Sequence, residues 1–121
     1  MPFVLGPDTY ETLTENGLKR RNPVKIELSG TTLGDILSAY RAKYGSTFTP
    51  YDGSDPNYAF ANDEPKKYFW FTGERWHHLQ DKTRVIDIHI IRHKKMICPK
   101  QDLSFKILAD DLVQIDVPVA C

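Results

Sequence analysis

Histidines are the residues of this sequence whose spacing points most directly to chemistry. The chain has four, and all lie between positions 77 and 93: His77, His78, His89 and His93. In an extended strand, side chains two or four positions apart share a face, so Asp87, His89 and His93 fall on one side. If the segment at His78 pairs with that strand, its imidazole joins them. Three imidazoles and a carboxylate are a donor set that suits zinc or iron. The candidate metal ligands are therefore His78, His89, His93 and Asp87.

The same histidines also have a plainer interpretation, as half-exposed strand residues. Adjacent His77 and His78 point to opposite faces of a strand, so at most one of them can join a cluster. We therefore expect no metal and no other cofactor. A His-rich metal-binding protein or metal-dependent enzyme is the second alternative for the function.

Other catalytic signatures are absent from the sequence. It contains no Gly-x-Gly-x-x-Gly loop and no Walker sequence, and no serine or cysteine lies in a nucleophile elbow. The run from Asp52 to Asn57 has oxygen ligands but lacks the spacing of an EF-hand loop, and the same residues are ordinary turn formers. We expect a protein that is not an enzyme.

Basic side chains interleaved with aromatic ones offer a different function, nucleic-acid binding. Aromatic rings on a sheet can stack on bases, while basic side chains contact phosphates. The residues concerned are Lys66, Lys67, Arg75, Arg92, Lys94 and Lys95. Against this, 16 basic and 16 acidic residues cancel, so the chain has no global field that attracts a polyanion. A nucleic-acid-binding or host-directed regulatory module is the first alternative.

The segment that holds these residues predicts a sheet. Over residues 66–119 apolar side chains fall on alternate positions, as in strands with one buried face. The expected strands are 67–72, 75–79, 84–92, 95–98, 103–107 and 113–119, with the first two joined in a hairpin at Gly73-Glu74. Because Pro118 cannot donate to a ladder, the last strand is predicted to be an edge strand or to end there.

The first half of the chain predicts one helix, over about residues 32–44. Its apolar residues form a single stripe: Leu33, Ile36, Leu37, Tyr40 and Tyr44. Thr31 or Thr32 caps its start, and Gly45 suits its end.

The remainder of the first half predicts short strands at 2–5 and 24–28. Between them we expect one weak helical turn from Asp8 through Leu13, ended by Asn16-Gly17, and then a small basic turn over 18–22. Together these elements predict one α+β domain, residues 1–121. It has a mainly antiparallel sheet of about six to seven strands, one helix packed on one face, and a long ordered loop over 46–65.

Aromatic residues exceed what one helix can cover. The strand at 67–72 is apolar on both faces and so needs cover on both. The loop over 46–65 supplies that cover, or a partner does, because tyrosine and tryptophan are favoured in protein interfaces. The expected interaction residues are Tyr51, Tyr58, Phe60, Tyr68, Trp70 and Trp76. We therefore expect a structural or interaction module that acts through protein–protein contacts, such as a phage or virus particle component or an assembly adaptor. Its partner is another protein or a further copy of itself.

Cysteine usage and hydropathy bear on localisation. Cys98 and Cys121 are expected as free thiols, with a bridge between them as the alternative, and the lack of a disulfide framework favours a reducing compartment. No apolar run is long enough to span a membrane, and the N-terminal segment lacks the basic region of a signal peptide. We expect a soluble protein, cytoplasmic when made, that can then enter a viral particle.

Overall fold

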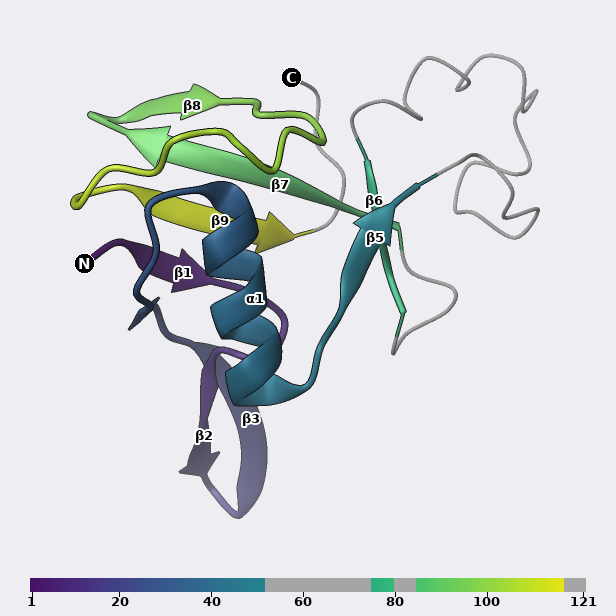
Figure 1. Ribbon diagram of the computed structural model, residues 1–121. Coiled ribbons are helices and arrows are strands. Elements are labelled where there is room, and N and C mark those ends of the chain that lie inside the picture. Colours follow the sequence, from purple (N-terminus) through teal and green to yellow (C-terminus); the bar gives the residue numbers. More distant parts are fainter. Residues whose placement is uncertain (52–74, 80–84, 117–121) are drawn as a thin grey trace, which may run out of the picture.

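The computed structural model of the chain describes residues 1–51, 75–79 and 85–116. Within them lies one helix, α1 (Leu33–Tyr44). The strands are β1 (Phe3–Leu5), β2 (Tyr10–Glu15), β3 (Leu18–Pro23), β4 (Ile26–Glu27), β5 (Phe48–Pro50), β6 (Trp76–His78), β7 (Val85–Arg92), β8 (Lys95–Ile97) and β9 (Leu112–Asp116). Figure 1 shows α1 lying across one face of the sheet that contains β1, β9 and β7.

Seven of these strands form one mixed sheet. Its order is β4-β1-β9-β7-β6-β5, and β8 pairs with β7. The pairs are antiparallel except for β1 with β9, which run parallel. The prediction of an α+β fold with one helix and a mainly antiparallel sheet is thus confirmed, with one parallel pair added. Because β9 lies between β1 and β7, the predicted edge position of the last strand is wrong; the alternative, that the strand ends at Pro118, concerns a residue outside the described ones.

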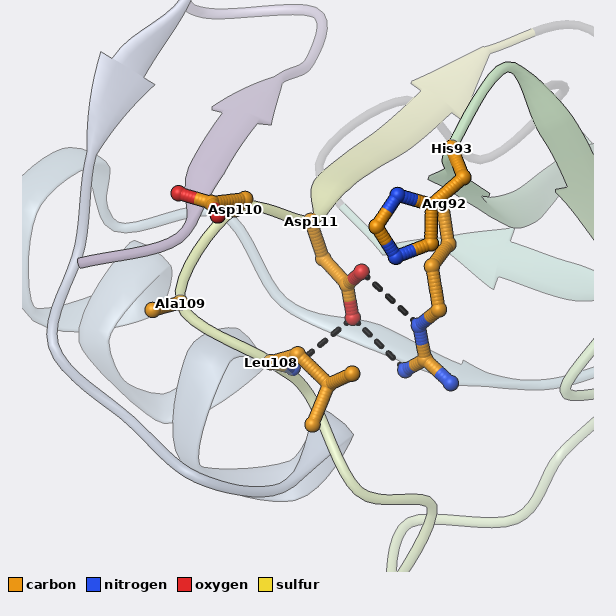
Figure 2. A pocket seen from close by; sticks show the side chains of 6 residues that line it. All are labelled: Arg92, His93, Leu108, Ala109, Asp110 and Asp111. Atoms are coloured by element: carbon orange, nitrogen blue, oxygen red, sulfur yellow. Dashed lines mark hydrogen bonds and ion pairs between the residues drawn. The ribbon is translucent and has the colours of Figure 1, made fainter.

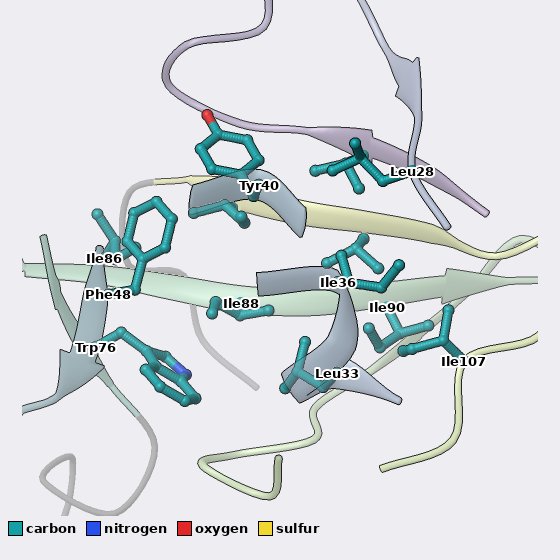
Figure 3. Packing of buried hydrophobic residues seen from close by; sticks show 13 residues of the cluster. Leu28, Leu33, Ile36, Tyr40, Phe48, Trp76, Ile86, Ile88, Ile90 and Ile107 are labelled. Carbon is teal, nitrogen blue, oxygen red and sulfur yellow. The ribbon is translucent and has the colours of Figure 1, made fainter. Parts of the chain in front are cut away.

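The hydrophobic core lies between α1 and the sheet (Figure 3). Alternation along β7 turns Ile86, Ile88 and Ile90 toward the helix, as the pattern predicted. The helix contributes three fully buried side chains from its apolar stripe: Leu33, Ile36 and Tyr40. Burial of each aliphatic side chain contributes roughly 1.5–3 kcal/mol, so this layer is a large favourable contribution to folding.

Both ends of α1 are capped by the residue types that the sequence offers. The Thr32 hydroxyl accepts from the Asp35 N–H at 3.2 Å, and the Asp35 carboxylate accepts from the Thr32 N–H at 3.2 Å, which completes a capping box. Hydrogen bonds, first among them that from the Thr31 N–H, lower the pKa of Asp35. At the other end Gly45 takes a left-handed conformation, φ 78°.

Residues 10–23 differ most from the prediction. The expected helical turn and basic turn are strands β2 and β3, which form a separate two-stranded sheet. Asn16 and Gly17 both have positive φ, 52° and 79°, as a two-residue hairpin turn requires. The dipeptide interpreted as a helix stop is therefore a hairpin turn.

Several other expectations need correction. Residues 103–107 form turns and one isolated bridge, Thr32 to Lys106, instead of a strand. Strand β5 lies inside the predicted loop, and β6 pairs with β5 and β7. Cys98 is disulfide-bonded, so a free thiol there is wrong. The predicted strand 67–72, its turn at Gly73-Glu74, most of the predicted loop and Cys121 lie outside the described residues.

Candidate functional site

A cluster of charged side chains is buried on the face of β7 that points away from α1. Asp87 and His89 alternate with the core isoleucines, and each is 2% exposed. Arg75, immediately before β6, is 3% exposed, and its Nη1 donates to Asp87 Oδ2. His89 Nε2 lies 3.2 Å from the same oxygen. The second carboxylate oxygen of Asp87 accepts from the Ile88 N–H at 3.1 Å.

Electrostatics make this cluster a compensated ion pair beside a neutral imidazole. Burial, and then the nearby Arg75 cation, lower the pKa of His89, while Asp116 opposes the shift. A guanidinium against a carboxylate in a buried site satisfies both charges, whereas either one alone would be costly. The arrangement therefore holds the chain at the start of β6 against β7.

The structure brings together only two of the four candidate metal ligands, Asp87 and His89. In the register of β6 with β7, Trp76 lies opposite Ile86 and His77 lies opposite Val85, the first residue of β7. His78 therefore lies beyond the start of β7 and away from Asp87. His78 is buried with its ring 5.0 Å from that of Phe48. His93 lies in the tight turn after β7, with φ 51°. Among the described residues, no group of three or more suitable side chains could hold a metal ion.

The far end of β7 carries a second ion pair, at a pocket of about 90 Å³ (Figure 2). Arg92 donates through Nε and Nη2 to the two oxygens of Asp111, at 2.9 and 2.7 Å. Asp111 also accepts from the Leu108 N–H at 2.8 Å. Burial alone would raise the pKa of Asp111, but these hydrogen bonds outweigh it and leave the pKa below its usual value. These contacts fix the turn that precedes β9.

Two of the six candidate residues for nucleic-acid binding, Arg75 and Arg92, take part in these ion pairs. Arg75 and Arg92 both direct their guanidinium groups to carboxylates of the same chain. Lys94 and Lys95 are exposed at the turn between β7 and β8. Lys66 and Lys67 lie outside the described residues. The predicted basic patch is therefore reduced, within the described chain, to two neighbouring lysines.

The two aromatic candidates that the structure describes, Trp76 and Tyr51, lie inside the domain. Trp76 is 1% exposed in the main core, and its Nε1–H donates to the Lys100 carbonyl at 3.2 Å. Tyr51 is buried against Val85. Neither side chain supplies the exposed contact surface expected of it. The other four, Tyr58, Phe60, Tyr68 and Trp70, lie outside the described residues.

The β2–β3 hairpin, called the arm from here on, is the most exposed ordered element that the structure describes. It projects away from the main sheet (Figure 1), and its strands contact chiefly each other. Most of its residues are exposed on both faces. Leu18, next to the turn, is 75% exposed, and Tyr10 at the other end is also exposed.

The two faces of the arm differ in charge. Cross-strand register places Glu11, Leu13, Glu15, Leu18, Arg20 and Asn22 on one face. There the Arg20–Glu15 ion pair is 2.9 Å long, and Asn22 donates to Glu11 at 3.0 Å. The other face carries Tyr10, Thr12, Thr14, Lys19, Arg21 and Pro23. Arg21 lies over the Tyr10 ring at 4.6 Å, and this face has no carboxylate.

The base of the arm is fixed to the C-terminal half of α1. The Asp8 carboxylate accepts from the Tyr40 hydroxyl at 2.8 Å and from the Ser46 hydroxyl at 2.6 Å. The Tyr40 oxygen in turn accepts from the Asp8 N–H at 2.8 Å. Burial raises the pKa of Tyr40; the hydrogen bond from the Asp8 N–H opposes this rise and the Asp8 carboxylate adds to it, so the hydroxyl stays a donor. The arm therefore leaves the domain in a defined direction.

Comparisons with protein-family models, with curated proteins and with solved structures found no match to this chain. In the part of the chain that the structure describes, no helix has both the length and the apolar character needed to cross a membrane.

Proposed function

We propose that the protein is a non-enzymatic interaction module and that the arm is its contact element. The observation that carries the proposal is an ordered two-stranded sheet whose two faces and two outer edges are exposed. An isolated two-stranded hairpin is marginally stable in water, and a third strand or an apposed surface stabilises it. A partner that pairs with the arm or covers it would therefore stabilise the hairpin.

The composition of the arm also supports this function. Leu18 beside the turn exposes an apolar side chain that contributes nothing to the core. A simple connection from β1 to β4 does not require two strands of six residues each. A component of a larger assembly, such as a phage or virus particle, or an assembly adaptor, is the form of this function that the sequence favours.

Site-specific photo-crosslinking tests the proposal. A photoreactive amino acid replaces Leu18 in the full chain, which is then expressed in its native cells. The matched control places the same group at Leu103, an exposed leucine in the turn after β8. We expect a discrete protein adduct from position 18 and none from position 103. No adduct from position 18, or equal adducts from both positions, would refute the arm as the contact element.

A further inference from the structure

We propose that the arm joins copies of this chain by strand addition, with β3 of one copy pairing edge to edge with β2 of a second copy. This inference rests on the proposed function and names the partner of the arm. Each strand of the arm is paired on one side only, so every second backbone N–H and C=O of its outer edge faces outward. Such an edge can accept another strand of matching length.

The two strands of the arm carry opposite charge. β2 contains two glutamates, Glu11 and Glu15, and no basic residue, whereas β3 contains Lys19, Arg20 and Arg21 and no acidic residue. Both strands have six residues. The arm therefore presents an acidic edge and a basic edge of equal length, and the acidic edge of one copy complements the basic edge of the next.

Internal pairing leaves a positive surplus that a second copy can neutralise. Arg20 already binds Glu15 on its own face, while Lys19 and Arg21 share a face without a carboxylate. The backbone groups of Lys19 and Arg21 face outward on β3, because the Val24 N–H bonds inward to the Thr9 carbonyl and every second residue does the same. A parallel second copy, aligned along all six residues of both strands, turns the outward groups of its β2 toward them and places its Glu11 opposite Lys19. Its Glu11 and Glu15 then both lie diagonal to Arg21, within reach of a long side chain.

The symmetry of this contact has a consequence for the assembly. A contact between β3 of one copy and β2 of another uses two different surfaces, so the first copy keeps its β2 edge unused and the second keeps its β3 edge. Such heterologous contacts continue into a ring or an open filament and do not stop at a dimer.

Lysine on an edge strand can also have the opposite role, because charged edges discourage strand addition. The two roles predict opposite results when the charge of β3 is reversed. If Lys19 and Arg21 protect the edge from a neutral neighbour, their loss increases association. If they pair with the glutamates of a second copy, their loss weakens it.

Charge exchange between variants tests the inference by sedimentation velocity over a concentration series. One variant carries Glu11→Lys and Glu15→Lys, and the other carries Lys19→Glu and Arg21→Glu. We expect wild-type chains to associate, and each variant alone to associate roughly tenfold more weakly, because two or more cross-strand charge pairs become repulsive. An equimolar mixture of the two variants should regain association, since each basic edge then meets an acidic one.

The matched control reverses Lys94 and Lys95 to glutamate, two exposed lysines at the turn between β7 and β8, and should associate like the wild type. Far-UV circular dichroism checks that each variant is folded. A variant whose arm had simply unfolded would not regain association in the mixture. The inference is overturned if the wild type stays monomeric, if the mixture does not recover, or if reversal of β3 strengthens association. A monomer that still crosslinks from position 18 to a different protein would overturn this inference and leave the proposed function intact.

Discussion

Among single residues, the buried pair of Arg75 and Asp87 has the largest expected effect on stability. Replacing Asp87 by alanine leaves a guanidinium that is 3% exposed without its carboxylate. We expect the free energy of unfolding to fall by about 3–5 kcal/mol. The double variant Arg75→Met/Asp87→Leu removes both charges and should recover most of that loss. Urea unfolding of the single variants Arg75→Met and Asp87→Leu and of the double variant measures the coupling between the residues.

An exposed ion pair provides the control for this cycle. Glu15→Ala removes the partner of Arg20 on the arm, where both side chains are largely in water. Its effect on the free energy of unfolding should stay below about 1 kcal/mol. If Asp87→Ala had an equally small effect, the ion pair behind β7 would not be a stabilising feature of the fold.

His89 gives the domain a pH dependence of stability with a defined sign. Its pKa in the folded protein is below the ordinary value of 6.5, so the unfolded chain binds the proton more tightly. The stabilisation from neutral His89 is therefore present above pH 6.5 and is lost progressively as the pH falls below it. Between about pH 6.5 and 5.5 the loss should approach 1.4 kcal/mol as an upper limit.

Urea midpoints at neutral and mildly acidic pH measure this effect. The variant His89→Gln should lose stability at neutral pH and show a flatter dependence below pH 6.5. An unchanged slope in His89→Gln would assign the acid sensitivity to other groups.

The sequence predicted part of this site and missed its key partner. Alternation places Asp87 and His89 on one face, and the structure confirms that they lie together. The contribution of Arg75 depends on the register between β6 and β7, which is set by side-chain packing of Trp76 against the isoleucines and is not encoded locally. The same register separates His78 from Asp87.

At the scale of elements, two glycines with positive φ provide a matched comparison. Gly17 in the turn of the arm and Gly45 after α1 have φ of 79° and 78°, and neither has an atom within 4 Å of an added Cβ. Substitution by alanine therefore tests backbone strain alone, at about 1 kcal/mol each. We expect Gly45→Ala to lower the global free energy of unfolding, since α1 covers the core.

Gly17→Ala should leave global unfolding nearly unchanged and instead accelerate amide hydrogen exchange in β2 and β3. Hydrogen-exchange mass spectrometry of both variants, alongside urea unfolding, distinguishes the two effects. A global loss of equal size in both variants would mean that the arm belongs to the cooperative core.

The elements that were predicted correctly are those that bury an apolar face. The stripe from Leu33 to Tyr44 and the alternating isoleucines of β7 each predicted both element and orientation. The arm was missed because its strands bury neither face, and the apolar residues of β2, Tyr10 and Leu13, are three positions apart, a spacing that does not indicate a strand. The dipeptide Asn16-Gly17 was the available signal for a hairpin. The parallel pairing of β1 with β9 joins opposite ends of the described chain, and local pattern carries no information about it.

The whole molecule consists of a packed body, made of α1 and the seven-stranded sheet, and the arm, which the body holds at a fixed angle. The body is stabilised by the layer between α1 and the sheet, and the arm contributes little to that layer. Stability and the proposed contact surface are thus separated in space. Such separation allows the sequence of the arm to change with little effect on folding.

Tyr40 links the two parts and is where this relation can be tested. Its ring is fully buried in the core, while its hydroxyl exchanges hydrogen bonds with Asp8 at the base of the arm. Tyr40→Phe keeps the ring and removes only the oxygen, so global stability should fall by about 1 kcal/mol. The arm should become more mobile on the nanosecond timescale, with lower amide order parameters in β2 and β3 by NMR relaxation. Tyr44→Phe, one helical turn later, is the control and should leave the arm as ordered as in the wild type. If Tyr40→Phe also left the order parameters unchanged, the direction of the arm would be set by its own strands, and the hydroxyl would serve the core alone.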